Sequence, residues 1–399
     1  MIRLLTFSTL YPSAANPEHG IFVETRLRHL LASGAVQSRV IAPVPWFPFR
    51  DSRFGEYSRF AATPPREVQH GIDVMHPRFV RLPKIGMTSA PFTLAQGAIG
   101  AARQLIRSGY DFDLIDAHYF YPDGVAAVLL GKALRKPVVI TARGTDINLI
   151  PRHALPRRMI LAAARRCAGI ITVCAALKDE LIALGVDESS VVVLRNGVDL
   201  ELFGLEDIRA ARGAFGISRF ALASVGHLIR RKGHDLVIGA LTELPDVDAY
   251  IAGSGPEEGR LRSLARSLGV ADRVHFLGAL PQERLSTLYN AVDALVLASS
   301  REGWANVLLE AMACGTPVVA SNVWGTPEVV AAPEAGVLMR ERTAAGMVEA
   351  VHRLRAALPA RTATRRYAEQ FSWDETTHGQ LELFAKILRT ERSGIPCHA

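Results

Sequence analysis

Residues 294–321 read ALVLASSREGWANVLLEAMACGTPVVAS, and they carry the clearest indication of the fold in this chain. An apolar run, Ala294–Leu297, leads into a loop and then into a helical pattern that begins near Asn306 and ends at Gly315, a residue type favoured just past a helix. A second apolar run follows at Pro317–Ala320. Strand, helix and strand in this order predict a parallel sheet with helices on both faces.

The same alternation runs along most of the chain in two series. The first series predicts strands at 2–7, 38–42, 114–117, 138–141, 169–173 and 191–194, and the second at 220–225, 248–252, 274–277, 294–297, 317–320 and 336–339. We therefore predict an α/β protein with two doubly wound units in succession. The pattern fails over Pro43–Pro91, which we interpret as a long loop or irregular insertion, and over Phe203–Ile217, which we interpret as a linker. A final helical pattern covers Ala368–Arg389.

Composition limits the possible classes of protein. The chain has 399 residues, of which 49% are hydrophobic and 21% charged, so general disorder is excluded. No apolar run has the length of a membrane span, and the first residues do not resemble a signal peptide. The four cysteines have neither paired nor zinc-like spacing. These features predict a soluble, cytoplasmic protein without disulfides or a structural metal.

Charge is distributed unevenly between the two halves. Residues 1–200 carry 24 Lys and Arg against 16 Asp and Glu, whereas the rest carries 22 against 23. The basic half indicates an anionic partner, such as an acidic substrate or a membrane surface, although an Arg-rich solvated surface explains the count equally well. The basic stretches Arg78–Lys84 and Arg152–Arg166 are candidates for contact with anionic lipid, with an ordinary amphipathic helix as the alternative for the second. Nucleic acid is not expected, because no RNA- or DNA-binding motif occurs.

Glu302 and Glu310 flank the predicted start of the helix at Asn306. A loop that contains glycine and enters a helix N-terminus offers free backbone N–H groups to a phosphate. A carboxylate accepts hydrogen bonds from neighbouring hydroxyls, so the pair suits a nucleotide sugar, with Glu310 on the ribose and Glu302 on the donor sugar. For one glutamate alone, stabilisation of the helix dipole would be the simpler interpretation.

Two further segments follow predicted strands. In GHLIRRKG, residues 226–233, Arg231 and Lys232 would neutralise a diphosphate without a metal, unless the segment is only a solvated basic turn. In AGSGP, residues 252–256, Gly253 and Gly255 form a strand exit of low specificity. Together with VHFLG, residues 274–278, it would let backbone approach a base.

These motifs, in this order, resemble the retaining glycosyltransferases of family four. The resemblance covers nearly the whole chain and is strongest over Phe220–Val330. In the first half, NPEHGIFVETRLRHL (residues 16–30) is similar to the family's glycine loop and first helix, and TARGTD (residues 141–146) to its HGxD-type loop. His118 occupies the position of a histidine that the family has at its catalytic centre.

The resemblance implies a GT-B fold, in which two Rossmann-like domains face each other across a cleft. It divides the chain into an acceptor-side domain, residues 1–203, and a nucleotide-sugar domain, residues 204–371, with a helix at 372–392 that packs back on the first domain. The implied catalytic residues are His118, Asp146, Lys232 and Glu302. The implied donor-binding residues are Gly20, Arg231, Lys232, Gly253, Gly255, Phe276, Leu277, Glu302, Gly303, Trp304, Asn306, Val307, Leu308 and Glu310.

The chain departs from the family pattern at two positions. His227 follows Gly226 where many members have arginine, which leaves open whether Arg230 or Arg231 joins Lys232. Arg143 stands where the HGxD-type loop has histidine. A DxD triplet at 111–113 matches a metal-binding signature of the other large glycosyltransferase fold, but a turn capped by aspartate explains it better, and no metal or cofactor is expected.

The sequence as a whole predicts transfer of a hexose-type unit from a nucleoside-diphosphate sugar to a hydroxyl of a saccharide or lipid-linked acceptor. Retention of configuration is implied by the resemblance; UDP is the first expectation for the nucleotide and GDP the second. The predicted setting is bacterial cell-surface or exopolysaccharide assembly, in the cytoplasm and peripheral to the inner face of the plasma membrane. The alternatives are a UDP-sugar epimerase on the same fold and a non-catalytic subunit that binds nucleotide sugars.

Overall fold

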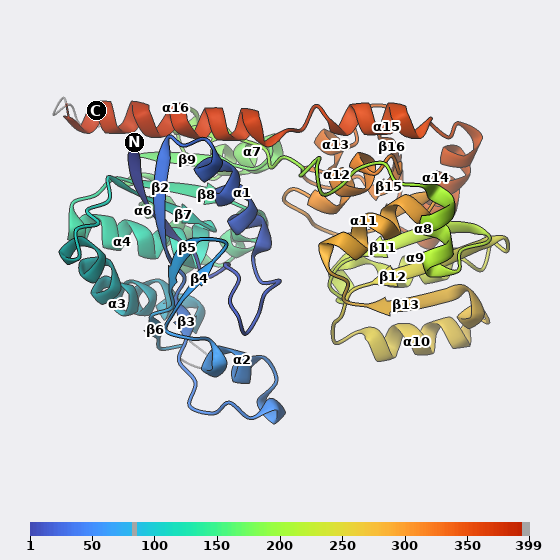
Figure 1. Cartoon of the computed structure of the whole chain (residues 1–399), viewed down its shortest axis with the longest axis horizontal. Coiled ribbons are helices and arrows are strands. Elements are labelled where there is room, and N and C mark those ends of the chain that lie inside the picture. Colours follow the sequence, from blue (N-terminus) through green and yellow to red (C-terminus); the bar gives the residue numbers. More distant parts are fainter. Residues whose placement is uncertain (82–85, 393–399) are drawn as a thin grey trace. The chain divides into compact units, whose positions relative to one another are not determined.

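The computed structural model describes residues 1–81 and 86–392 and divides them into two compact units (Figure 1). The first unit comprises Met1–Leu194 and the chain from Asp374 onward, and the second comprises Arg195–Trp373. The domain boundaries predicted from the sequence lie after residues 203 and 371. Among the described residues, no helix is both long enough and apolar enough to cross a membrane.

The first unit is built on one large sheet. Its strands are β1 (Ile2–Phe7), β2 (Val36–Ile41), β4 (Arg66–Gln69), β5 (Ile72–Met75), β7 (Leu114–His118), β8 (Val138–Ala142), β9 (Gly169–Thr172) and β10 (Val191–Val193). The strand order is β10-β9-β8-β7-β1-β2-β5-β4, and every pairing is parallel except that of β4 with β5. A separate parallel pair consists of β3 (Val44–Pro45) and β6 (Arg78–Phe79). The helices are α1 (Ile21–Ala32), α2 (Glu56–Ala62), α3 (Gly86–Arg107), α4 (Val125–Leu134), α5 (Thr145–Asn148), α6 (Ala154–Ala164), α7 (Ala175–Ala183) and α16 (Trp373–Arg392).

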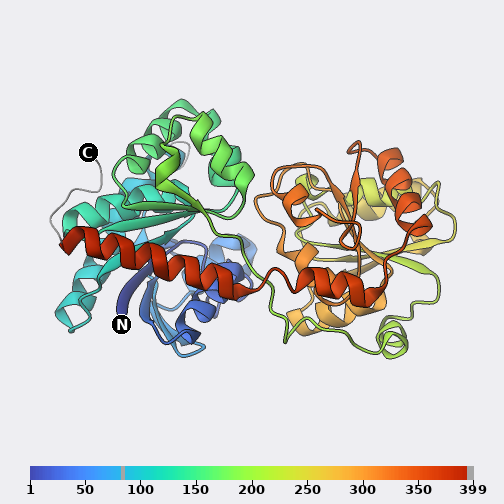
Figure 2. The same cartoon turned by 90° about the horizontal axis from the view of Figure 1, so that it is seen from above.

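The prediction that the last helix packs back on the first unit is confirmed. Phe384 and Ile387 of α16 are buried in one cluster with Leu4 of β1 and Val139 of β8. Figures 1 and 2 show α16 running along this unit over most of its length. The helix therefore completes the hydrophobic core of a unit whose other elements end at residue 194.

The second unit is a six-stranded parallel sheet. Its strands are β11 (Phe220–Val225), β12 (Val247–Ala252), β13 (Val274–Gly278), β14 (Ala294–Leu297), β15 (Val318–Ser321) and β16 (Gly336–Met339). The strand order is β13-β12-β11-β14-β15-β16, which is the 3-2-1-4-5-6 order of a Rossmann sheet. The helices are α8 (Ile208–Phe215), α9 (His234–Ala240), α10 (Glu258–Ser267), α11 (Gln282–Ala291), α12 (Asn306–Ala313), α13 (Thr326–Val329), α14 (Ala344–Ala356) and α15 (Arg361–Ala368).

The interpretation of Pro43–Pro91 as irregular is wrong for most of the described part of that segment. It contains β3, α2, β4, β5, β6 and the start of α3. The strands β4 and β5 form a hairpin whose turn has His70 and Gly71 at positive φ, and strands of two to four residues leave almost no periodic signal. Residues 82–84 of the basic stretch Arg78–Lys84 lie outside the described residues, as does Cys397.

The interpretation of Phe203–Ile217 as a linker is also wrong over its second half. Residues 208–215 form α8, which begins after Asp207, whose side chain accepts a hydrogen bond from the Ala210 N–H at 2.7 Å. Gly216 ends the helix in the left-handed conformation. Only Ala211 of this helix is buried, so its polar sequence lacks the apolar spacing that would have identified it. Ala368, where the last helix was expected to begin, belongs to α15.

Candidate active site

The order of the second sheet fixes where a ligand would bind. Strands β11 and β14 are neighbours in this sheet, and the strand order reverses between them: after β11 the chain continues to β12 on one side, and after β14 it continues to β15 on the other. The carboxyl end at such a switch point is the usual binding site in open α/β sheets. The motif 226–233 follows β11, and the Glu302 loop follows β14, so the sheet brings these two segments together.

Lys232 and Glu302 are in direct contact at this point. The Lys232 Nζ lies 2.7 Å from Oε1 of Glu302, and Nη1 of Arg231 lies 3.3 Å from the same oxygen. Burial alone would raise the pKa of Glu302, but Lys232, Arg231 and two hydrogen bonds hold it below its ordinary value. At Glu302, Lys232 is joined by Arg231, whereas the exposed Arg230 extends to Glu257 at 3.5 Å.

Glycines keep the backbone around this contact compact. Gly226 has φ 145°, and a Cβ there would lie 3.4 Å from Cε of Lys232. Gly253 has φ 142°, and its Cβ would lie 2.0 Å from the carbonyl oxygen of Gly226. At Gly255 a Cβ would lie 2.5 Å from the carbonyl oxygen of Leu228. Gly253 and Gly255, which are predicted to bind the donor, therefore have a structural reason to be glycine, because no larger residue fits where the β11 and β12 exits meet.

Glu310 lies one turn inside α12 and contacts Tyr289 of α11. The Tyr289 hydroxyl donates a hydrogen bond to Oε2 of Glu310 at 3.1 Å. Burial raises the pKa of Glu310 to about 7, and the hydrogen bond from Tyr289 opposes that shift. The helix begins at Asn306 and ends before Gly315, which has φ 77°, as the sequence predicted.

The other predicted donor residues surround this region without joining the ion pair. Asn306 Oδ1 accepts a hydrogen bond from Asn196 Nδ2 at 3.2 Å. The Trp304 indole is buried against Phe371, with ring centroids 6.0 Å apart, so this side chain contributes to packing. Phe276 lies beneath the guanidinium of Arg262, at 4.3 Å from the ring centroid. The remaining members are the buried Gly303 and Leu308, and the half-buried Val307 and Leu277.

The first unit has its own group of buried polar residues at the end of β7. Nη2 of Arg143 donates to Nδ1 of His118 at 2.7 Å, and Nε2 of His118 lies 3.3 Å from Oδ2 of Asp116. His118 is 1% exposed, and burial, with a smaller effect of Arg143, lowers its pKa, while Asp116 opposes the shift. Because arginine can only donate, this network assigns the ring proton of a neutral His118 to Nε2.

Asp146 holds the loop that carries Arg143. Its carboxylate accepts hydrogen bonds from the backbone N–H groups of Phe120 (2.6 Å), Gly144 (2.7 Å) and Arg143 (3.1 Å). Burial raises the pKa of Asp146, and these donors oppose the shift. The structure thus brings His118 and Asp146 together through Arg143, with Asp146 engaged by backbone.

Gly20 lies in the loop between β1 and α1. It has φ 71°, and a Cβ would lie 2.3 Å from the carbonyl carbon of Leu10. Thr9, the residue before Leu10, donates hydrogen bonds to the buried carboxylate of Asp123 from both its backbone N–H and its hydroxyl. These contacts tie the glycine loop to the turn that follows β7, the next strand in the sheet.

The DxD triplet has structural partners. Oδ1 of Asp111 lies 2.7 Å from Nζ of Lys136, and Oδ2 of Asp113 accepts the Arg3 N–H at 2.7 Å. Both contacts run to other segments of the first unit, Lys136 before β8 and Arg3 of β1, and not to the backbone of the turn itself, as the sequence had led us to expect. Over residues 1–81 and 86–392, no group of three or more His, Cys, Asp or Glu side chains is arranged to hold a metal ion.

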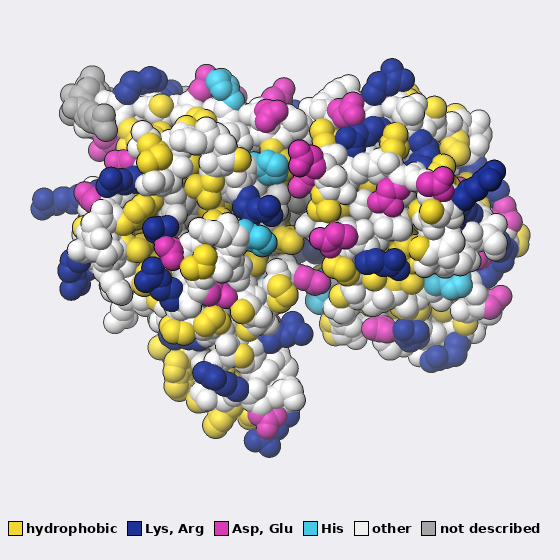
Figure 3. Space-filling view, viewed as in Figure 1, with side chains coloured by type: hydrophobic (Ala, Val, Ile, Leu, Met, Phe, Trp, Pro, Cys, Tyr) yellow, Lys and Arg dark blue, Asp and Glu magenta, His cyan; other side chains and the backbone are white. Residues whose placement is uncertain are grey.

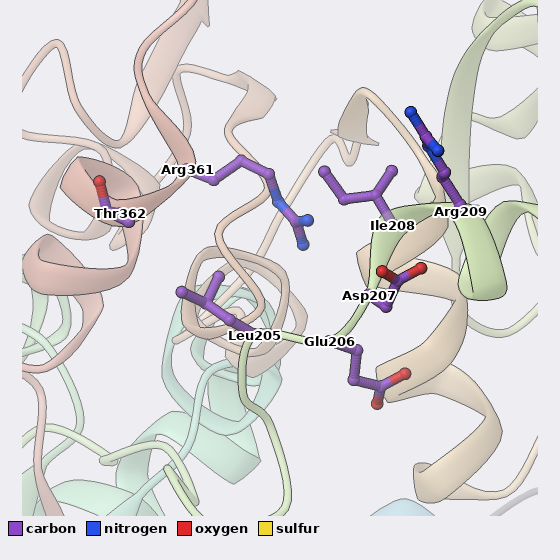
Figure 4. A pocket seen from close by; sticks show the side chains of 7 residues that line it. All are labelled: Leu205, Glu206, Asp207, Ile208, Arg209, Arg361 and Thr362. Atoms are coloured by element: carbon purple, nitrogen blue, oxygen red, sulfur yellow. The ribbon is translucent and has the colours of Figure 1, made fainter.

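A pocket of about 540 Å³ elsewhere in the second unit contains none of the predicted site residues. It is lined by residues 205–209 and by Arg361 and Thr362 (Figure 4). The Arg361 guanidinium is bonded to Oδ1 of Asn290 at 2.5 Å and to the Cys314 carbonyl at 2.7 Å, so it serves to hold α15 on α11 and α12.

Three residues of these groups were not predicted from the sequence: Asp116, Arg143 as a partner of His118, and Tyr289. A signal existed for Asp116, since it precedes His118 by two residues on one strand and therefore shares its face. None existed for Tyr289, which meets Glu310 only through the packing of α11 against α12.

The chain matches known protein families and individual proteins over most of its length. Residues 209–371 match the model "Glycosyl transferases group 1", and residues 56–202 match "Glycosyltransferase Family 4". D-inositol 3-phosphate glycosyltransferase of Mycolicibacterium smegmatis is 30% identical over 309 residues, 72% of this chain and 70% of that protein. TuaC of Bacillus subtilis, a glycosyltransferase named for teichuronic acid biosynthesis, is 28% identical over 366 residues, 88% and 89% of the two chains. With other curated relatives the match spans about half of their length.

Among solved structures, Anabaena Alr3699/HepE in complex with UDP has a TM-score of 0.73 at 22% identity and covers 97% of this chain and 100% of that one. The class of protein follows from the fold: two Rossmann-like units of this kind make up the GT-B architecture. Sequence places the chain more narrowly, and it belongs to glycosyltransferase family 4, the group 1 glycosyl transferases.

Proposed function

We propose that this protein transfers a hexose-type sugar from a nucleoside-diphosphate sugar to a hydroxyl of a saccharide or lipid-linked acceptor, with retention of anomeric configuration. The observation that carries the proposal is the contact of Lys232 and Arg231 with Glu302 at the switch point of the second sheet. Two cations and a carboxylate at one point suit a diphosphate next to a sugar hydroxyl.

Each residue of the second unit has a part in this proposal. Lys232 and Arg231 stabilise charge that accumulates on the leaving diphosphate, together with the N-terminus of α12. Glu302 accepts from the donor sugar, and Glu310 accepts from the ribose hydroxyls. UDP is our first choice of nucleotide and GDP our second; the UDP complex of Alr3699/HepE supports that order.

The first unit supplies the acceptor side. His118 is buried and bonded to Arg143, and it lies at the carboxyl end of β7, beside the glycine loop that follows β1. We assign His118 to the reacting sugar and Asp146 to the loop that positions Arg143 beside it. In this mechanism no side chain forms a covalent intermediate, and the leaving phosphate takes the acceptor proton.

The proposed setting is assembly of a bacterial cell-surface or extracellular polysaccharide at the inner face of the plasma membrane. The name of TuaC, which the chain matches over nearly its whole length, supports that setting. The positive charge of residues 1–200 favours an anionic surface nearby.

The test is a thermal-shift panel of UDP, GDP, ADP and their common sugar conjugates with EDTA present. A selective rise in Tm with one nucleotide supports metal-free donor binding. Sugar transfer from that donor is then measured with and without candidate acceptors. Free epimer without an acceptor would favour an epimerase, tight donor binding without any transfer would favour a binding subunit, and no shift with any nucleotide would overturn the proposal.

A further inference from the structure

A short segment of the first unit, residues 46–60, is unusually aromatic, and we call it the aromatic excursion. It follows β3 and contains the beginning of α2. The Phe47 ring lies 5.4 Å from Phe54 and 5.2 Å from Tyr57, and Phe49 stacks on Phe54 at 5.3 Å. These ring contacts fix the shape of the segment.

The same segment exposes much of its aromatic surface. Trp46 is 60% exposed, Phe49 54% and Tyr57 47%. Ring packing alone does not require this, since side chains that only stabilise a loop would turn inward. Contiguous exposed apolar surface on a soluble protein marks a site of interaction.

The exposed surface continues onto the neighbouring strand β6 and the residue after it. The backbone N–H of Trp46 donates a hydrogen bond to the Phe79 carbonyl at 2.8 Å, so Trp46 lies beside β6 and the exposed Val80. Helix α3 packs on β6, where a Cβ at Gly97 would lie 2.6 Å from the Arg78 carbonyl oxygen. Figure 3 shows hydrophobic side chains gathered over the β3, β6 and α2 end of this unit.

Arginines are interspersed with these apolar groups. The aromatic excursion has three exposed arginines, Arg50, Arg53 and Arg59. It has two acidic residues, Asp51 and Glu56. Arg53 lies 3.5 Å from Asp51 and over the Phe54 ring. The described residues provide no ion pair for Arg50 or Arg59, so both guanidinium groups are available to external anions.

We propose that the aromatic excursion docks the first unit on an anionic lipid surface. Trp, Tyr and Phe with interspersed arginine is the composition of a segment that lies in the interface between headgroups and acyl chains. The arginines then meet lipid phosphates, and the rings enter the apolar boundary. A second copy of the chain is the alternative occupant, and the mass measurement below tests it. The inference rests on the proposed function, in which a lipid-linked acceptor is reached at the membrane.

The first experiment is co-sedimentation with vesicles of phosphatidylcholine and with vesicles of equal parts phosphatidylcholine and phosphatidylglycerol. The wild-type chain is expected to bind the anionic vesicles preferentially. The variant Trp46→Ser/Phe49→Ser is expected to bind them at least about tenfold more weakly. Leu358→Ser, a change at a half-exposed leucine of the second unit, is the matched control and should bind like the wild type. Equal binding by wild type and double variant would overturn the proposal, as would wild-type binding that ignores lipid charge.

A second measurement reports on the aromatic excursion itself. Brominated acyl chains should quench part of the tryptophan emission of the wild type, and Trp46→Phe should abolish that part, leaving the signal of Trp304, Trp324 and Trp373. If the quenching persisted in Trp46→Phe, the chain would contact the membrane through a surface other than the aromatic excursion. Size-exclusion mass measurement of both proteins completes the test, since a wild-type dimer that the double variant disrupts would show that a second copy covers this surface instead.

The double variant also separates this inference from the proposed function. Its nucleotide-induced shift in Tm should equal that of the wild type, because the aromatic excursion belongs to the other unit. Normal donor binding with unchanged vesicle binding would overturn only the docking inference. Vesicle binding without any nucleotide shift in either protein would overturn only the proposed function.

Discussion

The Tyr289 hydroxyl donates a hydrogen bond to Oε2 of Glu310 across 3.1 Å, from one helix to the next. Tyr289 is fully buried, so it is not itself exposed to a ligand. Its hydrogen bond fixes the direction of the Glu310 carboxylate. Because a carboxylate has acceptor sites on both oxygens, one oxygen held by tyrosine leaves the other free to accept from a ligand. Tyr289 is therefore a positioning residue for the proposed ribose contact.

Replacement of this tyrosine gives the first prediction. Tyr289→Phe should raise the Kd for UDP about tenfold, since a hydrogen bond to a charged group contributes roughly 1.5–3 kcal/mol. It should also reduce the preference for UDP over 2′-deoxy-UDP, measured by calorimetry. A merely structural role would weaken both ligands equally, and that result would contradict the assignment.

The pH dependence of nucleotide binding gives the second prediction. Burial raises the pKa of Glu310 to about 7, so the carboxylate gains a proton as the pH falls through 7 and loses acceptor capacity. UDP affinity should decrease over that interval. Tyr289→Phe removes an interaction that lowers the pKa, so its transition should move to higher pH. Glu310→Gln is the control, because residue 310 no longer titrates in that variant and this transition should disappear.

Much of the fold could be predicted from sequence because long apolar runs and helical spacing are local signals. The bounds of β1, β11, β14 and β16 were predicted to the residue. The short strands β3 to β6 and the polar helix α8 were missed, since neither repeats long enough for its period to appear. Contacts between elements, such as that of Tyr289 with Glu310, depend on tertiary packing and leave no local signal.

Lys232 provides the third prediction. Lys232→Ala should lower kcat for sugar transfer by roughly 10²–10³-fold, because charge on the leaving diphosphate is greatest in the transition state. The matched control is Arg230→Ala, two residues away, which removes an exposed cation that contacts Glu257. Steady-state kinetics with saturating donor measure kcat for both variants and the wild type. Normal turnover by Lys232→Ala would remove the diphosphate assignment.

The partnership of Arg143 and His118 gives the fourth prediction. The groups that face His118 are Asp116 on its own strand, Arg143 on the next loop and Arg26 on α1. Burial and the two arginines lower the pKa of His118, while Asp116 raises it. Removing one cation in Arg143→Met should raise that pKa, so the acidic limb of the kcat/KM profile should move to higher pH.

Arg143→Lys separates charge from geometry at this site. It keeps a cation near His118 but loses the fixed fork of the guanidinium, so the acidic limb should stay in place while kcat falls. An acidic limb that is identical in wild type and Arg143→Met would mean that His118 does not govern the pH dependence.

Gly253 gives the last prediction, and it distinguishes two reasons for a glycine in a binding loop. At Gly253 an added Cβ would lie 2.0 Å from the Gly226 carbonyl oxygen, on a backbone with φ 142°, so Gly253→Ala should lower the free energy of unfolding by at least about 2 kcal/mol. Gly259→Ala in α10 meets no atom within 4 Å and should raise it by about 0.5–1 kcal/mol. Urea denaturation measures both. If Gly253→Ala were as stable as the wild type yet unable to bind nucleotide, close approach of the donor, and not the packing of two strand exits, would be the reason for this glycine.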